Sequence, residues 1–352
     1  MKSIKKRQAV NRLFILGAGA SYSATERGSG DFRRVTPLDK DFCRIICELK
    51  DKYDRPSWVS RSVEWIEKHW CDHVSMSDHG LEEAISEQLG HIDFLNAVHP
   101  HRQVASAQSY EYLRHLSYLI VFVLKKAREK ANTPYRTFFS KVFSGDADTC
   151  QDRVITFNYD DILDRHLLRK FPVQKVYFDR MGNDSAASYR RTIIFDAPLI
   201  VKLHGSVNWR CGKSEFSRAI GETAPIDDPY IHVWADETGV PSPADNTCPL
   251  IVPPLPAKPL SQIGIFRYLW TKAYEYLFEA REIIVCGYSL PEVDQFAKSL
   301  FANFSNGHVS KITVVDPDPQ ILKRWQQVLK RRNVPDVEWA WADDFAKFVN
   351  RM

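Results

Sequence analysis

Polar residues follow several short apolar runs in this chain, at positions where their side chains could contact a ligand. Asn158 and Asp160 come directly after the run Val154–Phe157, and His204 and Gly205 end another such run. Histidine titrates near neutrality and therefore suits a general base, and the glycine beside it permits a ligand to approach closely. The alternatives are structural, because asparagine and aspartate at such positions commonly cap the next helix and a single histidine is commonly hydrogen-bonded within the fold.

Glycines form a second group of candidate binding residues. Gly17, Ala18, Gly19 and Ser21 belong to the sequence GAGAS, which follows the run Leu13–Leu16. Glycines in such a turn let the backbone approach a pyrophosphate, and the serine can donate a hydrogen bond or cap a following helix. The third glycine of a GxGxxG motif is missing, so the sequence fits a tight turn without a ligand equally well.

Two later motifs follow the same pattern. Gly287 and Ser289 lie in GYSLP after the run Ile283–Cys286, and Asp316 begins DPDP after the run Ile312–Val315. An acid at the end of a strand can accept hydrogen bonds from ribose hydroxyls, whereas the alternative for DPDP is a turn stiffened by proline.

These motifs require elements that bring them together. The apolar runs lack the alternation of half-exposed strands, which indicates strands covered on both faces, as in a parallel sheet. Helical patterns lie between several of them, for instance over residues 161–170 and 319–331. Alternation of strands and helices predicts an α/β fold with a doubly wound parallel sheet.

Two long stretches depart from this alternation. Residues 37–143 read as mostly helical, with an amphipathic segment over 105–130, and we predict an inserted helical subdomain there. Residues 1–36 and 144–352 then form the sheet domain. Residues 206–260 are rich in proline, glycine and aspartate and are expected to be irregular. The helical segment could serve as a lid over a pocket or as an oligomerisation face.

Composition excludes several classes of protein. The chain has 352 residues, 44% of them hydrophobic and 26% charged, which is typical of a globular protein and argues against disorder. A net charge of +4 is too small to predict nucleic-acid binding. Seven cysteines, an odd number without a CxxC pair, indicate reduced thiols and a cytoplasmic protein. The apolar runs fall short of the roughly 20 residues that a membrane span needs.

The ordered series GAGAS, TFNYDD, KLHGSVNW, GYSLP and a final acid resembles the sirtuin superfamily, and most closely its SIR2-like branch, from about Phe14 to Asp316. The resemblance implies a Rossmann-like domain that takes NAD as its substrate and cleaves the bond between nicotinamide and ribose. It implies Asn158 and His204 as the catalytic pair. Together with Gly205, the residues expected to bind NAD are Gly17, Ala18, Gly19, Ser21, Asp160, Gly287, Ser289 and Asp316.

The departures from the family pattern indicate the reaction. Sirtuins that deacylate proteins carry two CxxC pairs for a structural zinc between the HG and GYSLP positions. Only Cys211 and Cys248 lie in that interval here, so no zinc is expected. A further group, His69, Cys71, His73 and His79, matches no standard zinc spacing, and solvated or capping histidines are expected there. The prediction is an NAD+ hydrolase that releases nicotinamide and ADP-ribose. The alternatives are an NAD-dependent protein deacylase and a non-catalytic sensor of NAD or ADP-ribose.

The resemblance also implies a biological setting. Proteins similar to this branch often act as effectors of bacterial anti-phage defence by depleting NAD. Because an unregulated NAD hydrolase would poison its own cell, we expect a homo-oligomer that pairs with a separate ATPase or translocase of the HerA type, or with a sensor. Nucleic acid would then be contacted only indirectly.

Overall fold

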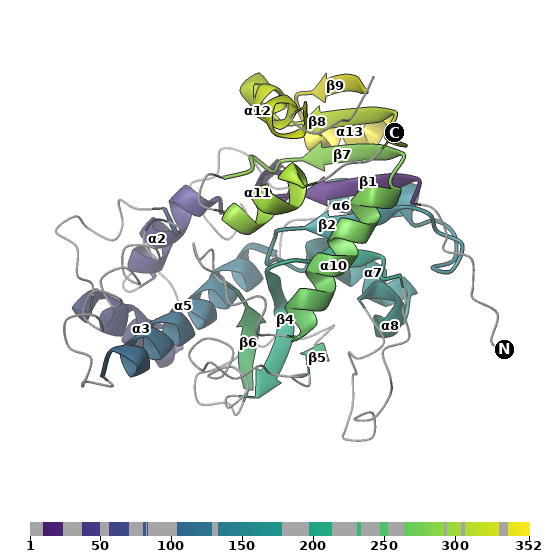
Figure 1. Cartoon of the computed structure of the whole chain (residues 1–352). Coiled ribbons are helices and arrows are strands. Elements are labelled where there is room, and N and C mark those ends of the chain that lie inside the picture. Colours follow the sequence, from purple (N-terminus) through teal and green to yellow (C-terminus); the bar gives the residue numbers. More distant parts are fainter. Residues whose placement is uncertain are drawn as a thin grey trace.

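A six-stranded parallel sheet forms the centre of the computed structural model (Figure 1). The structure describes residues 10–23, 37–49, 56–69, 80–81, 83, 104–128, 133–177, 197–212, 231–233, 247–252, 264–291, 294–303, 307–330 and 337–352. The strands are β1 (Arg12–Leu16), β2 (Arg153–Thr156), β3 (Ile200–Lys202), β7 (Glu282–Cys286), β8 (Lys311–Val315) and β9 (Glu338–Ala342).

The order of these strands across the sheet is β3-β2-β1-β7-β8-β9. Numbered along the chain, this is the Rossmann order 3-2-1-4-5-6, in which the direction of winding reverses between the first and fourth strands. Here these are β1 and β7, which pair from Arg12 with Glu282 to Leu16 with Cys286. The predicted α/β fold with a Rossmann-like doubly wound sheet is confirmed.

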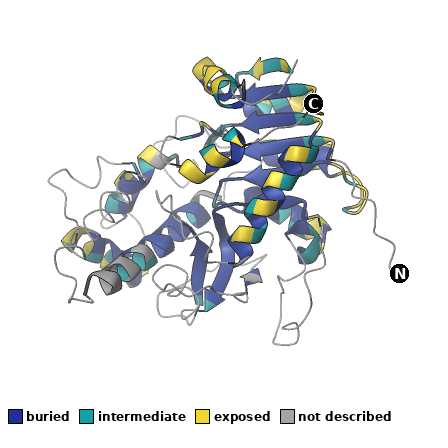
Figure 2. Cartoon of the chain, viewed as in Figure 1, coloured by how far each residue is buried: buried dark blue, intermediate teal, exposed yellow. Residues whose placement is uncertain are grey.

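Helices cover both faces of the sheet. They are α1 (Ala18–Ser23), α6 (Thr133–Val142), α7 (Ile162–Lys170), α8 (Val173–Val176), α10 (Gly264–Glu279), α11 (Gln295–Ala302), α12 (Pro319–Lys330) and α13 (Phe345–Arg351). On one face, Phe138 of α6 packs edge-on against Phe14 of β1 with ring centres 4.9 Å apart. Near the carboxyl ends, Phe301 of α11 packs against Trp325 of α12 at 4.7 Å. Figure 2 shows the strands β1, β2, β3, β7 and β8 as mostly buried.

The apolar runs form the predicted strands because both of their faces are covered. Leu13, Phe14, Ile15 and Leu16 of β1 are all buried, as are the corresponding residues of β7 and β8. The predicted helices 161–170 and 319–331 agree with α7 and α12 to within one residue at each end. The strand β9 was not predicted; it lies at the edge of the sheet and is half exposed, so it lacks a continuous apolar run.

The helical segment contains α2 (Asp39–Glu48), α3 (Ser57–Lys68) and α5 (Val104–Arg128). The expectation of an amphipathic helix is wrong for the middle of α5, because the run Tyr118–Leu124 is buried on every side. Trp58 of α3 packs against Tyr118 and Phe122, and the Tyr118 hydroxyl donates to the carbonyl of Thr247 at 2.7 Å. A helix enclosed by other elements has no solvent-facing side and carries apolar residues all round.

A second, antiparallel sheet encloses the other side of α5. It consists of β5 (His232–Val233), β4 (Gly205–Gly212) and β6 (Thr247–Ile251), in that spatial order. The expectation that residues 206–260 are irregular is therefore wrong for these strands. Pro249 lies in β6, at the edge, where the missing N–H of proline is tolerated. Residues 213–230, 234–246 and 253–260 lie outside the described part of the chain.

The helix α6 falls within the predicted insertion 37–143 but packs with the helices of the central sheet. Its Tyr135 and Phe138 contact Phe345 of α13, with ring centres 5.4 and 6.0 Å apart. The separate status of residues 37–143 stays a prediction. Among the described helices, none combines the length and the hydropathy needed to cross a bilayer. The described cysteines are free thiols, and Cys71 lies outside the described residues.

Candidate functional site

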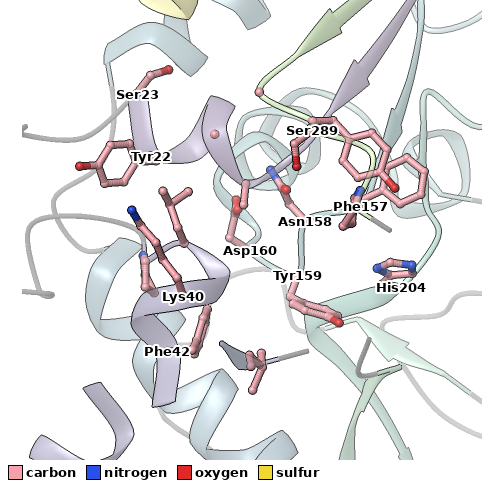
Figure 3. Close-up of a pocket in the computed structure, with 18 of the residues that line it drawn as sticks. Tyr22, Ser23, Lys40, Phe42, Phe157, Asn158, Tyr159, Asp160, His204 and Ser289 are labelled. Carbon is pink, nitrogen blue, oxygen red and sulfur yellow. The ribbon is translucent and has the colours of Figure 1, made fainter. Parts of the chain in front are cut away.

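A cavity of about 630 Å³ lies at the carboxyl ends of the central strands (Figure 3). The loops after β1, β2, β7 and β8 line it, and β1 and β7 are the strands between which the winding reverses. Ligands of open α/β sheets bind at this position because the loops after adjacent strands turn to opposite faces and leave a crevice. The volume is typical of a small-molecule site.

The structure brings most of the predicted site residues to this cavity. Those that line it are Ala18, Gly19, Asn158, Asp160, His204, Gly287, Ser289 and Asp316. Three predicted residues, Gly17, Ser21 and Gly205, do not line it. These three residues contact other residues of the protein that form or hold the cavity wall.

The glycines of GAGAS and GYSLP hold two loops against each other. The N–H groups of Gly17 and Gly19 donate to the carbonyls of Cys286 and Gly287 at 3.0 and 2.9 Å. A Cβ at Gly17 would lie 2.5 Å from the carbonyl oxygen of Gly287, and Gly287 itself has a φ of +58°. The amides of Gly17 and Gly19 are therefore bonded within the protein, and these glycines bring the β1 and β7 loops together. Their contact with a pyrophosphate stays a prediction.

The backbone geometry at Gly205 also requires a glycine. Its φ is +80°, and an added Cβ would lie 2.2 Å from the carbonyl oxygen of Leu250 in β6. The backbone that approaches this glycine is thus that of the neighbouring strand. A close approach to Gly205 was expected from a ligand; in the structure the backbone of β6 approaches it.

Ser21 holds the carboxamide of Asn158 and the carboxylate of Asp160. The fully buried hydroxyl donates to Asp160 Oδ2 at 2.7 Å, and Oγ lies 3.1 Å from Asn158 Nδ2 and 3.0 Å from the Tyr135 hydroxyl. A hydroxyl has one proton to donate and two lone pairs, so this arrangement satisfies it completely. Asn158 Nδ2 also donates to the carbonyl of Gly17 at 2.9 Å. Both protons of the carboxamide are thus fixed, which leaves Oδ1 as its acceptor end.

Asp160 combines capping with a place in the cavity wall. Its Oδ1 accepts from the N–H of Ile162 at 3.2 Å, whereas Asp161, at the N-cap position of α7, makes no capping bond with its side chain. Burial raises the pKa of Asp160, and the nearby Lys202 ammonium opposes this shift. Lys202 donates to the Asp160 carbonyl and lies 3.1 Å from Asp164 Oδ2. The capping alternative for the TFNYDD motif is therefore correct for Asp160.

His204 is held in a mostly aromatic pocket. Its ring centre lies 5.4, 6.0 and 6.4 Å from those of Phe157, Tyr159 and Trp270. Its Nε2 lies 3.3 Å from Oδ2 of Asp294. Figure 3 shows His204 beside Phe157 and Tyr159, toward one end of the labelled residues, with Asp160 and Asn158 nearer the other.

The loop after β7 is fixed by contacts behind the cavity. The carbonyl of Tyr288 accepts from Trp325 Nε1 at 3.1 Å, and that of Ser289 accepts from Arg324 at 2.8 Å. The Tyr288 ring stacks on Phe157 at 4.0 Å, which joins this loop to the one after β2. Leu290 has a φ of +54°, a conformation that costs energy for a residue other than glycine and that neighbouring contacts must maintain.

Asp316 lines the cavity and also forms a local turn. Its Oδ1 accepts from the N–H of Asp318 at 2.9 Å, as expected for the turn alternative of DPDP. Burial raises the pKa of its carboxyl group. The residue is therefore both a turn former and an acidic group at the end of β8 that faces the cavity.

Other cavity residues escaped the sequence analysis. The helical segment contributes Lys40 and Phe42 from α2, Leu124 from α5, and Leu81, so it forms part of the wall. Asp294 was also missed, although an aspartate before the apolar pattern of α11 is a recognisable N-cap signal. His69 stacks on Trp65, and Cys71, His73 and His79 lie outside the described residues.

Comparisons with known proteins add no name to this site. No family model and no curated protein matches this chain. The motifs and the geometry of the cavity therefore carry the functional assignment.

Proposed function

We propose that this protein is an NAD+ hydrolase that cleaves the bond between nicotinamide and ribose. The observation that supports this most strongly is the position of the cavity at the winding reversal of a sheet of order 3-2-1-4-5-6, with Asn158 and His204 in its wall. That strand order is typical of dinucleotide-binding domains, which bind their ligand at this crevice. A pure binding site needs neither a buried imidazole nor an oriented carboxamide.

The chemistry of NAD+ suits these side chains. Nicotinamide is a cationic substituent that leaves as a neutral molecule, and its departure creates an oxocarbenium-like ribose, as in glycoside hydrolysis. In the proposed reaction Asn158 Oδ1 orients the attacking water and His204 accepts a proton from that water or from the ribose. Assistance by a general base typically increases the rate by about 10²–10⁴-fold. Water then bonds to C1′, and the products are nicotinamide and ADP-ribose.

The contacts of Asn158 explain why an asparagine is suitable. Gly17 and Ser21 bind both protons of the Nδ2 group, so the carboxamide cannot rotate without losing two hydrogen bonds. A fixed acceptor loses little entropy when it binds a water or a hydroxyl, which favours catalysis over a mobile side chain.

The direct test is incubation of the purified chain with NAD+, followed by chromatographic separation of the products. Asn158→Ala and His204→Ala should each reduce nicotinamide release by at least about 100-fold. His308→Ala, on the exposed turn before β8, is the control and should keep full activity. Undiminished NAD+ loss in either site variant would refute the assignment.

The same assay separates the alternative functions. A deacylase would release nicotinamide only when an acyl-lysine peptide is added. A sensor would show a thermal shift with NAD+ or ADP-ribose and form no product. Either outcome would replace the hydrolase proposal.

Regulation by assembly belongs to the same proposal. We expect the chain to form a homo-oligomer in the cytoplasm and to be gated by a separate ATPase or translocase, as implied by the resemblance to defence effectors. A purified chain that is monomeric and fully active without a partner would contradict this expectation.

A further inference from the structure

The strongest unassigned feature is a buried carboxylate that faces His204. Asp294 Oδ2 lies 3.3 Å from His204 Nε2, and the two residues are only 2% and 5% exposed. They are 90 residues apart in the sequence, at the end of β3 and at the start of α11. A contact of this kind between two buried ionisable groups is costly to build unless each satisfies the other.

Asp294 is fixed independently of the histidine. Its Oδ1 accepts from the N–H of Ala297 at 3.1 Å, which caps α11, and its Oδ2 lies 3.5 Å from the Tyr288 hydroxyl. The N-terminus of a helix and a donated N–H both favour the ionised form of a carboxyl group. The position of the carboxylate is therefore set by contacts other than the one with His204.

Aromatic side chains also lie around the His204 ring. Phe157 and Tyr159 come from the loop after β2, Trp270 comes from α10, and the Tyr288 hydroxyl reaches Asp294 from the loop after β7. The Tyr159 hydroxyl donates to the carbonyl of Val252 at 2.9 Å. Of the charged groups on these elements, Lys272 of α10 pairs with Glu275 on the same helix at 2.8 Å, and Asp160 accepts from Ser21. The contact with Asp294 places a carboxylate beside Nε2 of His204.

We propose that Asp294 is a positioning residue that holds the proton of neutral His204 on Nε2 and stabilises the imidazolium that forms during the reaction. This inference rests on the proposed function. Because a carboxylate at Nε2 requires a donor there, the neutral ring carries its lone pair on Nδ1.

The proton balance of the step follows from this tautomer. When His204 acts as the base, an O–H bond of the water or of a ribose hydroxyl breaks and an N–H bond forms at Nδ1. The ring becomes a cation next to a carboxylate that stays ionised, so the new charge has a partner in a buried site. Asp294 takes up no proton, and His204 returns its proton to solvent after the product leaves.

The first arm of the test uses Asp294→Asn, which preserves size and an acceptor for the Ala297 N–H but removes the charge. Its matched control is Asp344→Asn, because Asp344 is also buried and caps α13 by accepting from the Lys347 N–H at 2.9 Å. We expect Asp294→Asn to lower kcat for NAD+ by at least about 100-fold with little change in KM, since an interaction with the base acts on the chemical step. The acid limb of the pH–rate profile should move to lower pH by about one unit, because an imidazolium without its carboxylate forms less readily.

The second arm does not depend on activity. In ¹⁵N spectra of the histidine-labelled full chain, assigned with His204→Gln, the wild type should show a protonated Nε2 and an unprotonated Nδ1 for His204 at alkaline pH. Asp294→Asn should shift this tautomer, and Asp344→Asn should leave it unchanged. Identical spectra and pH profiles in Asp294→Asn and the wild type would overturn the proposal. A wild type that cleaves no NAD+ would refute the proposed function, and the spectra alone would then decide whether Asp294 sets the tautomer.

Discussion

Replacement of the buried Ser21 by alanine should destabilise the fold far more than the same replacement of a surface serine. The substitution removes three hydrogen bonds, which join Ser21 to the Asp160 carboxylate, to Asn158 and to Tyr135. A bond to a charged group contributes about 1.5–3 kcal/mol and a neutral bond about 1 kcal/mol. We therefore expect Ser21→Ala to lower the free energy of unfolding by about 3–5 kcal/mol.

Ser23→Ala is the matched control for this prediction. Ser23 lies in the same short helix and, unlike Ser21, lines the cavity; its hydroxyl donates to the carbonyl of Ala20 at 3.1 Å. Its loss should cost about 1 kcal/mol or less. Denaturant unfolding followed by tryptophan fluorescence measures both variants.

The pH dependence of the Ser21→Ala effect provides a second signature. Burial raises the pKa of Asp160, and the bond from Ser21 opposes that shift, so the variant raises the pKa of Asp160 further. The added cost falls on the ionised carboxylate. It should therefore be complete at alkaline pH and shrink as the pH falls through the pKa of Asp160 in the variant and then in the wild type. A loss below about 1 kcal/mol, or a loss equal to that of Ser23→Ala at every pH, would show that this network does not hold the site together.

Other parts of the structure give further expectations. Gly287 has a φ of +58°, and an added Cβ would lie 2.1 Å from the backbone nitrogen of Ala20. Gly287→Ala should therefore lower the free energy of unfolding by at least about 3 kcal/mol in urea, whereas Gly307→Ala, at an exposed and open position, should change it by less than about 1 kcal/mol. Lys202→Met leaves a buried aspartate without its cation and should cost about 3–5 kcal/mol in the same assay, against less than about 1 kcal/mol for exposed Lys347→Met. Burial lowers the pKa of His115 to about 4 in the folded chain. Between about pH 4 and pH 6.5 the unfolded chain therefore binds this proton and the folded chain does not, so the free energy of unfolding should rise with pH over this range. His115→Gln should flatten that rise by about 1–2 kcal/mol, allowing for the partial exposure of the ring, and an unchanged slope would refute this origin.

The sequence alone determined five of the six strands of the central sheet and the loops after them that line the cavity. Apolar runs without alternation require two covered faces, which made β1, β2, β3, β7 and β8 predictable before any contact was known. Each polar motif directly follows one of these parallel strands, and the carboxyl ends of parallel strands lie at the same edge of a sheet. The sequence therefore also predicts that the motifs lie at one edge. This is why Asn158 and His204 could be placed at one cavity from their positions in the chain.

Only the tertiary structure decided which residues support the site and what the long excursions become. The middle of α5 is buried all round because α3 and the β4–β6 sheet enclose it, and neither partner can be inferred from the periodicity of the helix itself. Gly17 and Gly287 are needed because two loops about 270 residues apart pack backbone to backbone. Asp294 reads in sequence as an ordinary helix cap, and only folding brings its second oxygen to His204. The physical reason is the same in each case, since contacts between residues distant in the chain depend on how the elements pack, whereas the patterns in a sequence report local burial.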